Sequence, residues 1–269
     1  MNYLFALLVL SDVPSPGSLV IVGGGKITPA IREEFVRLSG GAEKAKIVVI
    51  PTASIDADNP KEHESYLAEW RKLKPASIEI LHTRDRKMAD DAEFARPIRE
   101  ATAVWFSGGD QNRLIDAFRG TLVEKEFHRL LERGGVIGGT SAGAAIMSDV
   151  MIQGGKDANV KTGPGFGFVK GIVVDQHFTN RKRQPRLRHV LSQHPTLAGL
   201  GIDEGTAAVI RGDEIKVIGT GSVTAIDAVK SKHSKRERVL KEGGSLPLTE
   251  LRMSPALKGG SKPLHSKGP

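Results

Sequence analysis

The stretch GVIGGTSAGAAIM, residues 135–147, decides the fold class. It contains the pattern G-x-S-x-G, in which a buried strand turns abruptly into a helix and holds Ser141 at the bend. Gly139, Ala142 and Gly143 allow so tight a turn, because larger side chains would collide with the neighbouring strand or helix. The turn exposes the Ser141 hydroxyl and directs the first amides of the new helix toward the same point. We therefore predict a nucleophile elbow with Ser141 as the nucleophile.

The rest of the chain repeats this alternation of strand and helix. Apolar runs that predict strands occupy residues 19–22, 46–50, 78–81, 103–106, 136–138, 172–174 and 207–210. Amphipathic segments that predict helices occupy residues 29–38, 62–73, 112–118 and 122–133. Several of the strands are apolar throughout, as expected when both faces of a sheet are covered. The pattern predicts a flavodoxin-like three-layer α/β sandwich with a largely parallel sheet and a site at the carboxyl ends of its strands.

Composition separates both ends of the chain from this body. Residues 214–218 and 223–226 flank a GTGS turn and predict a β-hairpin that closes the domain near Lys230. We expect three parts: an N-terminal extension or truncated signal (1–17), a catalytic α/β domain (18–230), and a basic, flexible tail (231–269). The apolar octet at residues 3–10 lacks a preceding Lys or Arg. We therefore favour a cytoplasmic protein, with secretion as the alternative if residues 1–17 are a truncated signal.

The net charge of +8 lies almost entirely in the tail. From Lys230 to the end of the chain there are ten Lys and Arg residues but three Asp and Glu residues. A segment rich in Lys, Ser, Gly and Pro cannot bury enough apolar surface to fold alone. We interpret it as a solvated tail, and the alternative is an RNA- or membrane-binding arm. We accordingly expect no nucleic-acid partner and no membrane partner.

Metal and cofactor chemistry find little support in the sequence. The chain has no cysteine and no HExxH pattern, and we expect no metal site. The stretch VIVGGGK, residues 20–26, resembles a dinucleotide fingerprint, but Thr28 stands where its last glycine belongs. We interpret these glycines as a turn beside the site and expect no cofactor.

A nucleophilic serine needs a base, and the base needs a group that orients it. His177 follows the apolar run 172–174, which places it at the carboxyl end of a strand. Asp203 and Glu204 follow residues 201–202 in a turn just before another strand, and either could orient the imidazole. The spacing does not choose between them.

Two further segments are expected to line the site. In FSGGDQ, residues 106–111, a second strand runs into a helix, so the Gly109 region and the Ala142 amide are candidates for an oxyanion hole. Gln111 could orient the substrate, while the alternative is a plain loop in which Asp110 caps a helix. The run RKRQPRLR, residues 181–188, holds five cations and reads either as a solvated helix face or as a clamp for carboxylates.

Together these stretches resemble the serine peptidase family that contains cyanophycinase and peptidase E. The matching motifs, in chain order, are VGGG (22–25), PTAS (51–54), GGDQ (108–111), GTSAGA (139–144), DQHF (175–178) with the arginines that follow it, and GIDE (201–204). The resemblance extends over nearly the whole body of the chain, from about residue 18 to residue 227, and DQHF with its spaced arginines is the most specific of these motifs.

The resemblance carries its own expectations. It implies a fold related to class I glutamine amidotransferases, a catalytic triad of Ser141, His177 and Glu204, a homodimer, and no cofactor. The implied substrate is cyanophycin, a poly-aspartate backbone with arginine linked to each β-carboxyl, which is degraded to β-Asp-Arg dipeptides. The substrate would be bound by Gln111, Asp175, Gln176, Arg181, Arg183 and Arg186.

Two alternatives remain. A peptidase E-like enzyme would cleave small Asp-X dipeptides instead of the polymer. An inert amidotransferase-like binding module would keep the elbow as a relic. Separately, G-x-S-x-G can arise by chance in a chain with 31 glycines.

Overall fold

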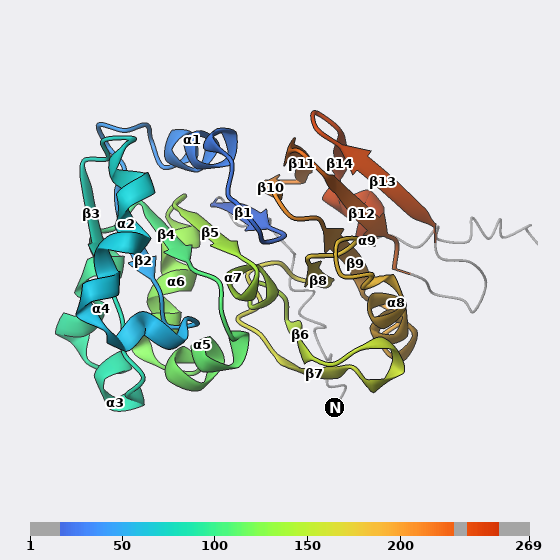
Figure 1. The fold of residues 1–269 in the computed structure, drawn as a ribbon, viewed down its shortest axis with the longest axis horizontal. Coiled ribbons are helices and arrows are strands. Elements are labelled where there is room, and N and C mark those ends of the chain that lie inside the picture. Colours follow the sequence, from blue (N-terminus) through green and yellow to red (C-terminus); the bar gives the residue numbers. More distant parts are fainter. Residues whose placement is uncertain (1–16, 229–235, 253–269) are drawn as a thin grey trace, which may run out of the picture.

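The computed structural model describes residues 17–228 and 236–252 of the 269-residue chain (Figure 1). Residues 1–16, 229–235 and 253–269 lie outside the described residues. They include nearly all of the N-terminal extension and much of the basic tail. The described chain forms an eight-stranded sheet, a four-stranded sheet and a two-stranded ribbon. The predicted fold class, an α/β sandwich with a large, mostly parallel central sheet, is confirmed.

Five strands of the main sheet are parallel. In spatial order they are β1 (Ser18–Val22), β5 (Val136–Thr140), β4 (Ala103–Phe106), β2 (Lys46–Ile50) and β3 (Ser77–Ile80). Three antiparallel strands extend the sheet beyond β1: β10 (Thr206–Arg211), β11 (Glu214–Gly219) and β14 (Ser245–Pro247). Because β1 and β5 are neighbours and parallel, their carboxyl ends bring Val22 and Thr140 side by side.

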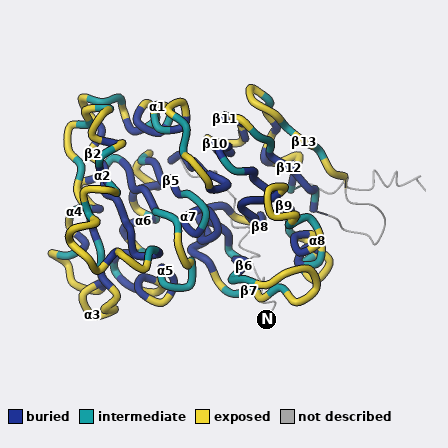
Figure 2. Tube along the Cα trace, in the orientation of Figure 1, coloured by how far each residue is buried: buried dark blue, intermediate teal, exposed yellow. Residues whose placement is uncertain are grey.

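Helices cover both faces of this sheet, which explains why several of its strands, such as β4, are apolar throughout. On one face, α1 (Pro29–Leu38) and α2 (His63–Arg71) pack Phe35 and Trp70 against Trp105. The other face packs against α4 (Ala92–Glu100), α5 (Gln111–Phe118), α6 (Leu122–Glu132) and α7 (Ala142–Ala145). Figure 2 shows the strands as the most buried part of the chain. The short helix α3 (Arg86–Ala89) and the 3-10 turns η1 (Ile55–Asp58) and η2 (Pro60–Glu62) join the layers.

The second sheet packs beside the first and shares its core. Its strands are β13 (Glu237–Lys241), β12 (Ser222–Ile226), β9 (Ala198–Ile202) and β8 (Ile172–Gln176). Helix α8 (Gln184–Gln193) covers its other face through Leu187, Val190 and Leu191. The ribbon β6 (Val150–Gly154) and β7 (Lys161–Pro164), with η3 (Asp157–Asn159), follows α7.

The structure corrects the predicted pairing of two strands and assigns another predicted strand to the second sheet. The predicted hairpin of residues 214–218 and 223–226 does not form, because β11 pairs with β10 and β14, whereas β12 pairs with β9 and β13. The Gly219–Ser222 connection instead passes from one sheet to the other. The hairpin that does form joins β10 to β11 through Gly212 and Asp213, with Gly212 at φ +57°. The strand that precedes His177, β8, likewise lies in the second sheet.

The folded body also extends beyond the boundary predicted near Lys230. Residues 237–252 form β13, β14 and α9 (Leu248–Arg252). Strand β14 pairs with β11, and Leu246, Leu248 and Leu251 are buried in the main core. The prediction rested on the basic composition of this stretch and therefore missed the three leucines that anchor it to the core. Within the described residues, none of the helices combines the length and apolar character needed to cross a membrane.

Candidate active site

Ser141 stands between β5 and α7 in a strained backbone conformation, with φ 54° and ψ −106°. Such a conformation costs on the order of 1–3 kcal/mol and persists only where the surroundings enforce it. The Ser141 amide donates to Val22 O at 3.1 Å. A Cβ atom on Gly139 would lie 2.5 Å from Gly143 O, and one on Gly143 would lie 2.5 Å from Phe106 O. The small residues of the elbow are therefore required by close backbone contacts, as the sequence predicts.

His177 follows β8 and reaches Ser141 from the second sheet. Its backbone has φ +50°, and its amide donates to Gly23 O at 2.6 Å. The imidazole is buried, and 2.8 Å separates His177 Nε2 from Ser141 Oγ. The structure thus brings the predicted hydroxyl and the predicted imidazole into direct contact.

Glu204, in the turn after β9, approaches the other side of the imidazole. A distance of 2.5 Å separates its Oε1 from His177 Nδ1. An ionised carboxylate only accepts hydrogen bonds, so His177 Nδ1 carries the proton and Nε2 is left to accept from the Ser141 hydroxyl. The Glu204 amide donates to Asn180 Oδ1 at 2.9 Å, a contact that the sequence analysis did not single out.

Asp203, the alternative carboxylate, points to different partners. It accepts hydrogen bonds from the amides and hydroxyls of Thr179 and Ser222, at distances of 2.6–3.1 Å. Burial acts to raise the pKa of Asp203, but the hydrogen bonds from Ser222 and Thr179 outweigh it and lower the pKa. The choice that the sequence left open thus falls on Glu204 as the partner of the imidazole.

The protonation state of His177 suits a base. Burial lowers the pKa of His177, the hydrogen bond with Glu204 acts to raise it, and the nearby charge of Arg181 lowers it further. The net shift is downward from the ordinary value of 6.5. The imidazole is therefore neutral at neutral pH, with Nε2 available to take a proton.

The glycines of VGGG pack directly against His177, Asp203 and Glu204, which confirms that they form a turn beside the site. A Cβ atom on Gly23 would lie 2.2 Å from Asp203 O. One on Gly24 would lie 2.3 Å from His177 Cε1, and one on Gly25 would lie 2.9 Å from Glu204 Cβ. The loop leaves room for the imidazole and carboxylate only because it has no side chains.

Replacing Gly24 with alanine should therefore lower kcat/KM by about 10- to 100-fold, because the new methyl group displaces the His177 ring. Gly24 has φ +107°, so the change also strains the backbone. Gly41 is the matched control, since it has φ +83° but nothing within 4 Å of a built Cβ. Gly41→Ala should reproduce the loss of thermal stability from backbone strain and leave kcat/KM unchanged. Equal activity losses in both variants would contradict a steric effect on His177.

The second glycine turn, between β4 and α5, lies against Ser141. The Ser107 amide donates to Ile50 O at 3.1 Å and the Asp110 amide to Ala53 O at 2.9 Å, so both ends of the turn are fixed. A Cβ atom on Gly108 would lie 3.5 Å from Ser141 Cβ. Within the described residues, the amides of Gly108, Gly109 and Ala142 make no hydrogen bond with another protein group. Asp110 also caps α5 by accepting from the Asn112 amide, as the alternative interpretation of this loop predicts, and the oxyanion role of its amides stays a prediction.

The arginine-rich segment is divided between a buried ion pair and the exposed surface. Asp175 is fully buried and binds Arg186 through both carboxylate oxygens, one of them at 2.8 Å from Arg186 Nε. Arg183 lies 3.7 Å from Asp175 and donates to Gln176 O at 2.7 Å. Burial lowers the pKa of Arg183 to about 10, so it remains charged at neutral pH. Asp175 and Arg186 neutralise each other, whereas Arg181 is exposed and its charge acts on the His177 imidazole.

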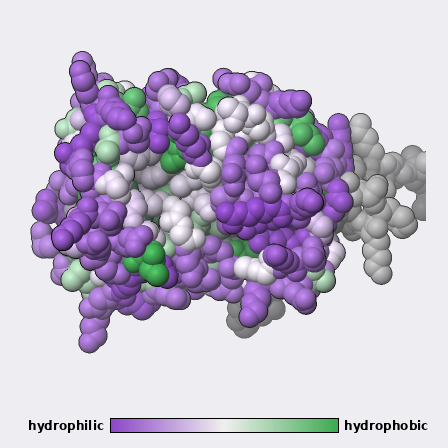
Figure 3. Space-filling model, in the orientation of Figure 1, coloured by the Kyte–Doolittle hydropathy of each residue, from purple (hydrophilic) through white to green (hydrophobic). Residues whose placement is uncertain are grey.

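The two predicted glutamines have different surroundings. Gln111 Nε2 donates to Ile152 O at 3.0 Å and to Gln153 O at 2.7 Å, which ties α5 to β6. Gln176 is buried, and its Oε1 has no hydrogen-bond partner among the described residues. In Figure 3 a pale area of intermediate hydropathy overlies α7, and a strongly hydrophilic area adjoins it over the region of β8 and α8.

An α/β fold that presents a serine hydroxyl to an imidazole, with a carboxylate behind it, defines the class of serine hydrolases. Residues 19–218 match Peptidase family S51, and the chain belongs to this family. The enzyme is accordingly a serine peptidase, and its substrate is a peptide.

Relatives and solved structures agree with this assignment. The chain is 34% identical over 247 residues to a cyanophycinase from Geminocystis herdmanii (strain PCC 6308), covering 88% of this chain and 89% of the relative. It is 34% identical over 243 residues to a cyanophycinase from Trichormus variabilis (strain ATCC 29413 / PCC 7937), covering 86% and 80%. The crystal structure of a peptidase from an acI-B1 Actinobacterium matches with a TM-score of 0.67 and 26% identity, covering 86% of this chain and 96% of that one.

Proposed function

We propose that the protein degrades cyanophycin to β-Asp-Arg dipeptides, with Ser141 as nucleophile, His177 as general base and acid, and Glu204 as the group that orients the imidazole. The observation that carries the proposal is the unbroken chain of contacts from Ser141 Oγ through His177 to Glu204. The named cyanophycinases, each 34% identical over most of the chain, support the choice of substrate.

The chemistry follows from the protonation states at the site. His177 Nε2 takes the proton of the Ser141 hydroxyl as Oγ attacks the scissile carbonyl carbon. The carbonyl oxygen becomes an oxyanion, which the amides of Ala142 and Gly109 would stabilise. His177 returns its proton to the leaving amine, and an acyl-enzyme ester remains on Ser141. Water then attacks the ester with His177 again as base, which releases the carboxylic acid and restores the hydroxyl.

Recognition of the substrate is proposed to involve the residues around His177. Arg181 is exposed beside the imidazole, and its guanidinium can bind a substrate carboxylate in bidentate fashion. The side-chain oxygen Oε1 of Gln176 is buried without a partner in the described chain, and a substrate N–H group can donate to it. Asp175, Arg183 and Arg186 would support this wall of the site through their shared ion pair. Gln111 would act through β6, which it holds.

Mass spectrometry of the products tests the proposed substrate. Purified enzyme should release β-Asp-Arg from cyanophycin and should cleave a panel of small Asp-X dipeptides at least about tenfold more slowly, because the reaction uses binding energy from the neighbouring units of the polymer. Rapid cleavage of the dipeptides with no release of β-Asp-Arg would instead identify a peptidase E-like exopeptidase. Absence of products from both would favour the inert binding module.

We also propose that the protein is a homodimer, which the resemblance to the family supports. Light scattering coupled to size-exclusion chromatography measures the mass directly, and a particle of one 28.9 kDa chain would contradict the proposal.

A further inference from the structure

The loop PTAS, residues 51–54, is held by one guanidinium that comes from another part of the chain. Arg84 lies in the segment after β3 and donates to two carbonyl oxygens of this loop. Its Nη1 lies 3.1 Å from Thr52 O, and its Nη2 lies 2.8 Å from Ser54 O. Arg84 therefore bridges the backbone on both sides of Ala53 and fixes the direction of the carbonyl between them.

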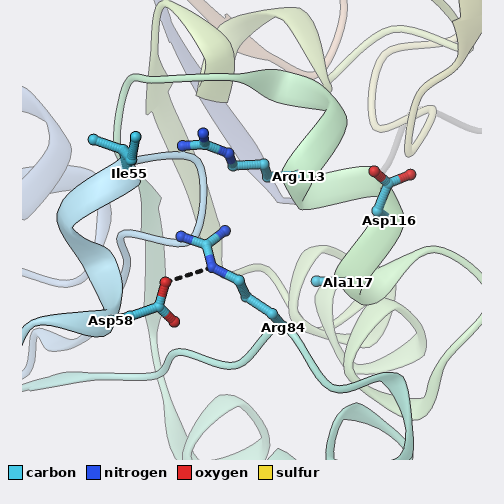
Figure 4. Close-up of a pocket in the computed structure, with 6 residues that line it drawn as sticks. All are labelled: Ile55, Asp58, Arg84, Arg113, Asp116 and Ala117. Carbon is cyan, nitrogen blue, oxygen red and sulfur yellow. Dashed lines mark hydrogen bonds and ion pairs between the residues drawn. The ribbon is translucent and has the colours of Figure 1, made fainter.

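Asp58 and His82 complete this support. Asp58 Oδ2 accepts from Arg84 Nε at 2.6 Å, and Asp58 Oδ1 lies 2.9 Å from His82 Nε2. His82 Nδ1 in turn lies 2.8 Å from Thr52 Oγ1. The hydrogen bond with His82 and, to a lesser extent, that with Arg84 lower the pKa of the Asp58 carboxyl. Figure 4 shows Arg84 extended toward Asp58 beneath Ile55, along a pocket of about 330 Å³ that Arg113 also lines.

These contacts resemble a second hydroxyl–imidazole–carboxylate chain, but its hydroxyl cannot serve as a nucleophile. Thr52 is completely buried, so no substrate reaches its Oγ1. The cluster of Asp58, His82 and Arg84 instead faces the backbone of residues 51–54. Its effect is to hold that backbone in place.

The held loop in turn determines where the Gly108–Gly109 turn lies. Ala53 O accepts from the Asp110 amide at 2.9 Å and from Arg113 Nη1 at 3.3 Å. A Cβ atom on Gly109 would lie 2.1 Å from Ala53 O, so the two backbones are in contact. On its other side the turn meets Ser141, through Gly108. A displacement of Ala53 would therefore move the Gly108–Gly109 turn, which packs against Ser141.

We propose that Arg84 is a positioning residue for the hydrolytic reaction: by bridging Thr52 O and Ser54 O, it aligns the Gly108–Gly109 amides with the oxyanion that forms on the scissile carbonyl. The inference rests on the proposed function, because it takes those amides as part of the oxyanion hole. Because the Arg84 guanidinium is engaged by Thr52 O, Ser54 O and Asp58, its loss should act on the transition state more than on substrate binding.

The test compares Arg84→Ala and Arg84→Lys with a matched control, Arg86→Ala. Arg86 also donates to two backbone carbonyls, Asp116 O at 2.9 Å and Arg119 O at 2.7 Å, but these lie toward the end of α5 that is remote from Ser141. With soluble cyanophycin fragments as substrate, Arg84→Ala should lower kcat by about 10- to 100-fold and change KM by less than about threefold. Arg84→Lys should recover part of kcat, since an ammonium group can reach one of the two carbonyls. Arg86→Ala should keep kcat within about twofold of wild type.

The outcomes separate this inference from the proposed function. Unchanged kcat in Arg84→Ala, or an equal loss of kcat in Arg86→Ala at similar melting temperature, would overturn the positioning role and leave the proposed function intact. A rise in KM with unchanged kcat would also overturn it, because that pattern indicates substrate binding. The proposed function would be overturned by different results: no activity of the wild-type enzyme on cyanophycin, or activity that persists when Ser141 is replaced.

Discussion

Replacing Ser141 with alanine is expected to lower kcat on cyanophycin by about 10⁴-fold or more, the largest effect of any single substitution in this protein. The change removes the atom that forms the acyl-enzyme, so His177 and Glu204 are left with no nucleophile to activate. Residual turnover would come from the oxyanion amides and substrate binding alone. Initial rates of β-Asp-Arg release, measured with enough enzyme to detect very slow turnover, give the ratio.

Ser192 provides the control for this substitution. It is an exposed serine on α8 whose hydroxyl donates to His189 O, away from the site. Ser192→Ala should retain full activity and should still react with a fluorophosphonate probe, whereas Ser141→Ala should not be labelled. Wild-type rates in Ser141→Ala, or labelling that persists in it, would exclude Ser141 as the nucleophile.

The second large effect is expected from Glu204→Gln, which should lower kcat by about 10²–10⁴-fold. Glutamine is nearly isosteric with glutamate, but it carries no charge to stabilise the imidazolium that forms as Ser141 is deprotonated. Its amide group can also donate to His177 Nδ1, which favours the tautomer with the proton on Nε2. That tautomer cannot accept the proton of the Ser141 hydroxyl. Rates and melting temperatures are measured together.

Asp203→Asn is the matched control, because Asp203 is the adjacent carboxylate in the same turn. Its oxygens accept four hydrogen bonds from Thr179 and Ser222, and a single amide oxygen cannot replace both. Asp203→Asn should therefore lower stability by about 1–3 kcal/mol while kcat falls much less than in Glu204→Gln. The reverse pattern, with the larger loss of kcat in Asp203→Asn, would assign the orienting role to Asp203.

The sequence predicts most of the elements and the meeting of the reactive groups, because each rests on a local pattern. Residues 103–106 read as a buried strand and the structure has β4 at the same bounds; residues 29–38 read as a helix and α1 occupies them. Helix α1 starts where Thr28 accepts from the Ile31 amide and Pro29 takes the first position, both of which are visible in the sequence. Ser141 and His177 each sit at the end of an apolar strand.

What the sequence could not predict depends on contacts between distant segments. Residue spacing alone does not choose between Glu204 and Asp203, and although the family resemblance implied Glu204, its contact with His177 depends on the direction in which the turn presents each side chain. The prediction that β11 pairs with β12 was wrong for a similar reason. The GTGS sequence is compatible with a hairpin, and only the packing of the two sheets places these strands in different sheets. The contacts of Arg84 with residues 52 and 54 span about thirty positions of chain, beyond any local pattern.

The backbones of both reactive residues are anchored to the end of β1, since Val22 O accepts from the Ser141 amide and Gly23 O accepts from the His177 amide. One short stretch of backbone thus fixes the relative positions of Ser141 and His177, which follow strands of two different sheets. Turnover consequently requires the two sheets to pack in their native arrangement. It should be lost in any compact state that keeps the helices and strands but loosens the packing between the sheets. Hydrolysis by this enzyme reports on its tertiary integrity more sensitively than its secondary-structure content does.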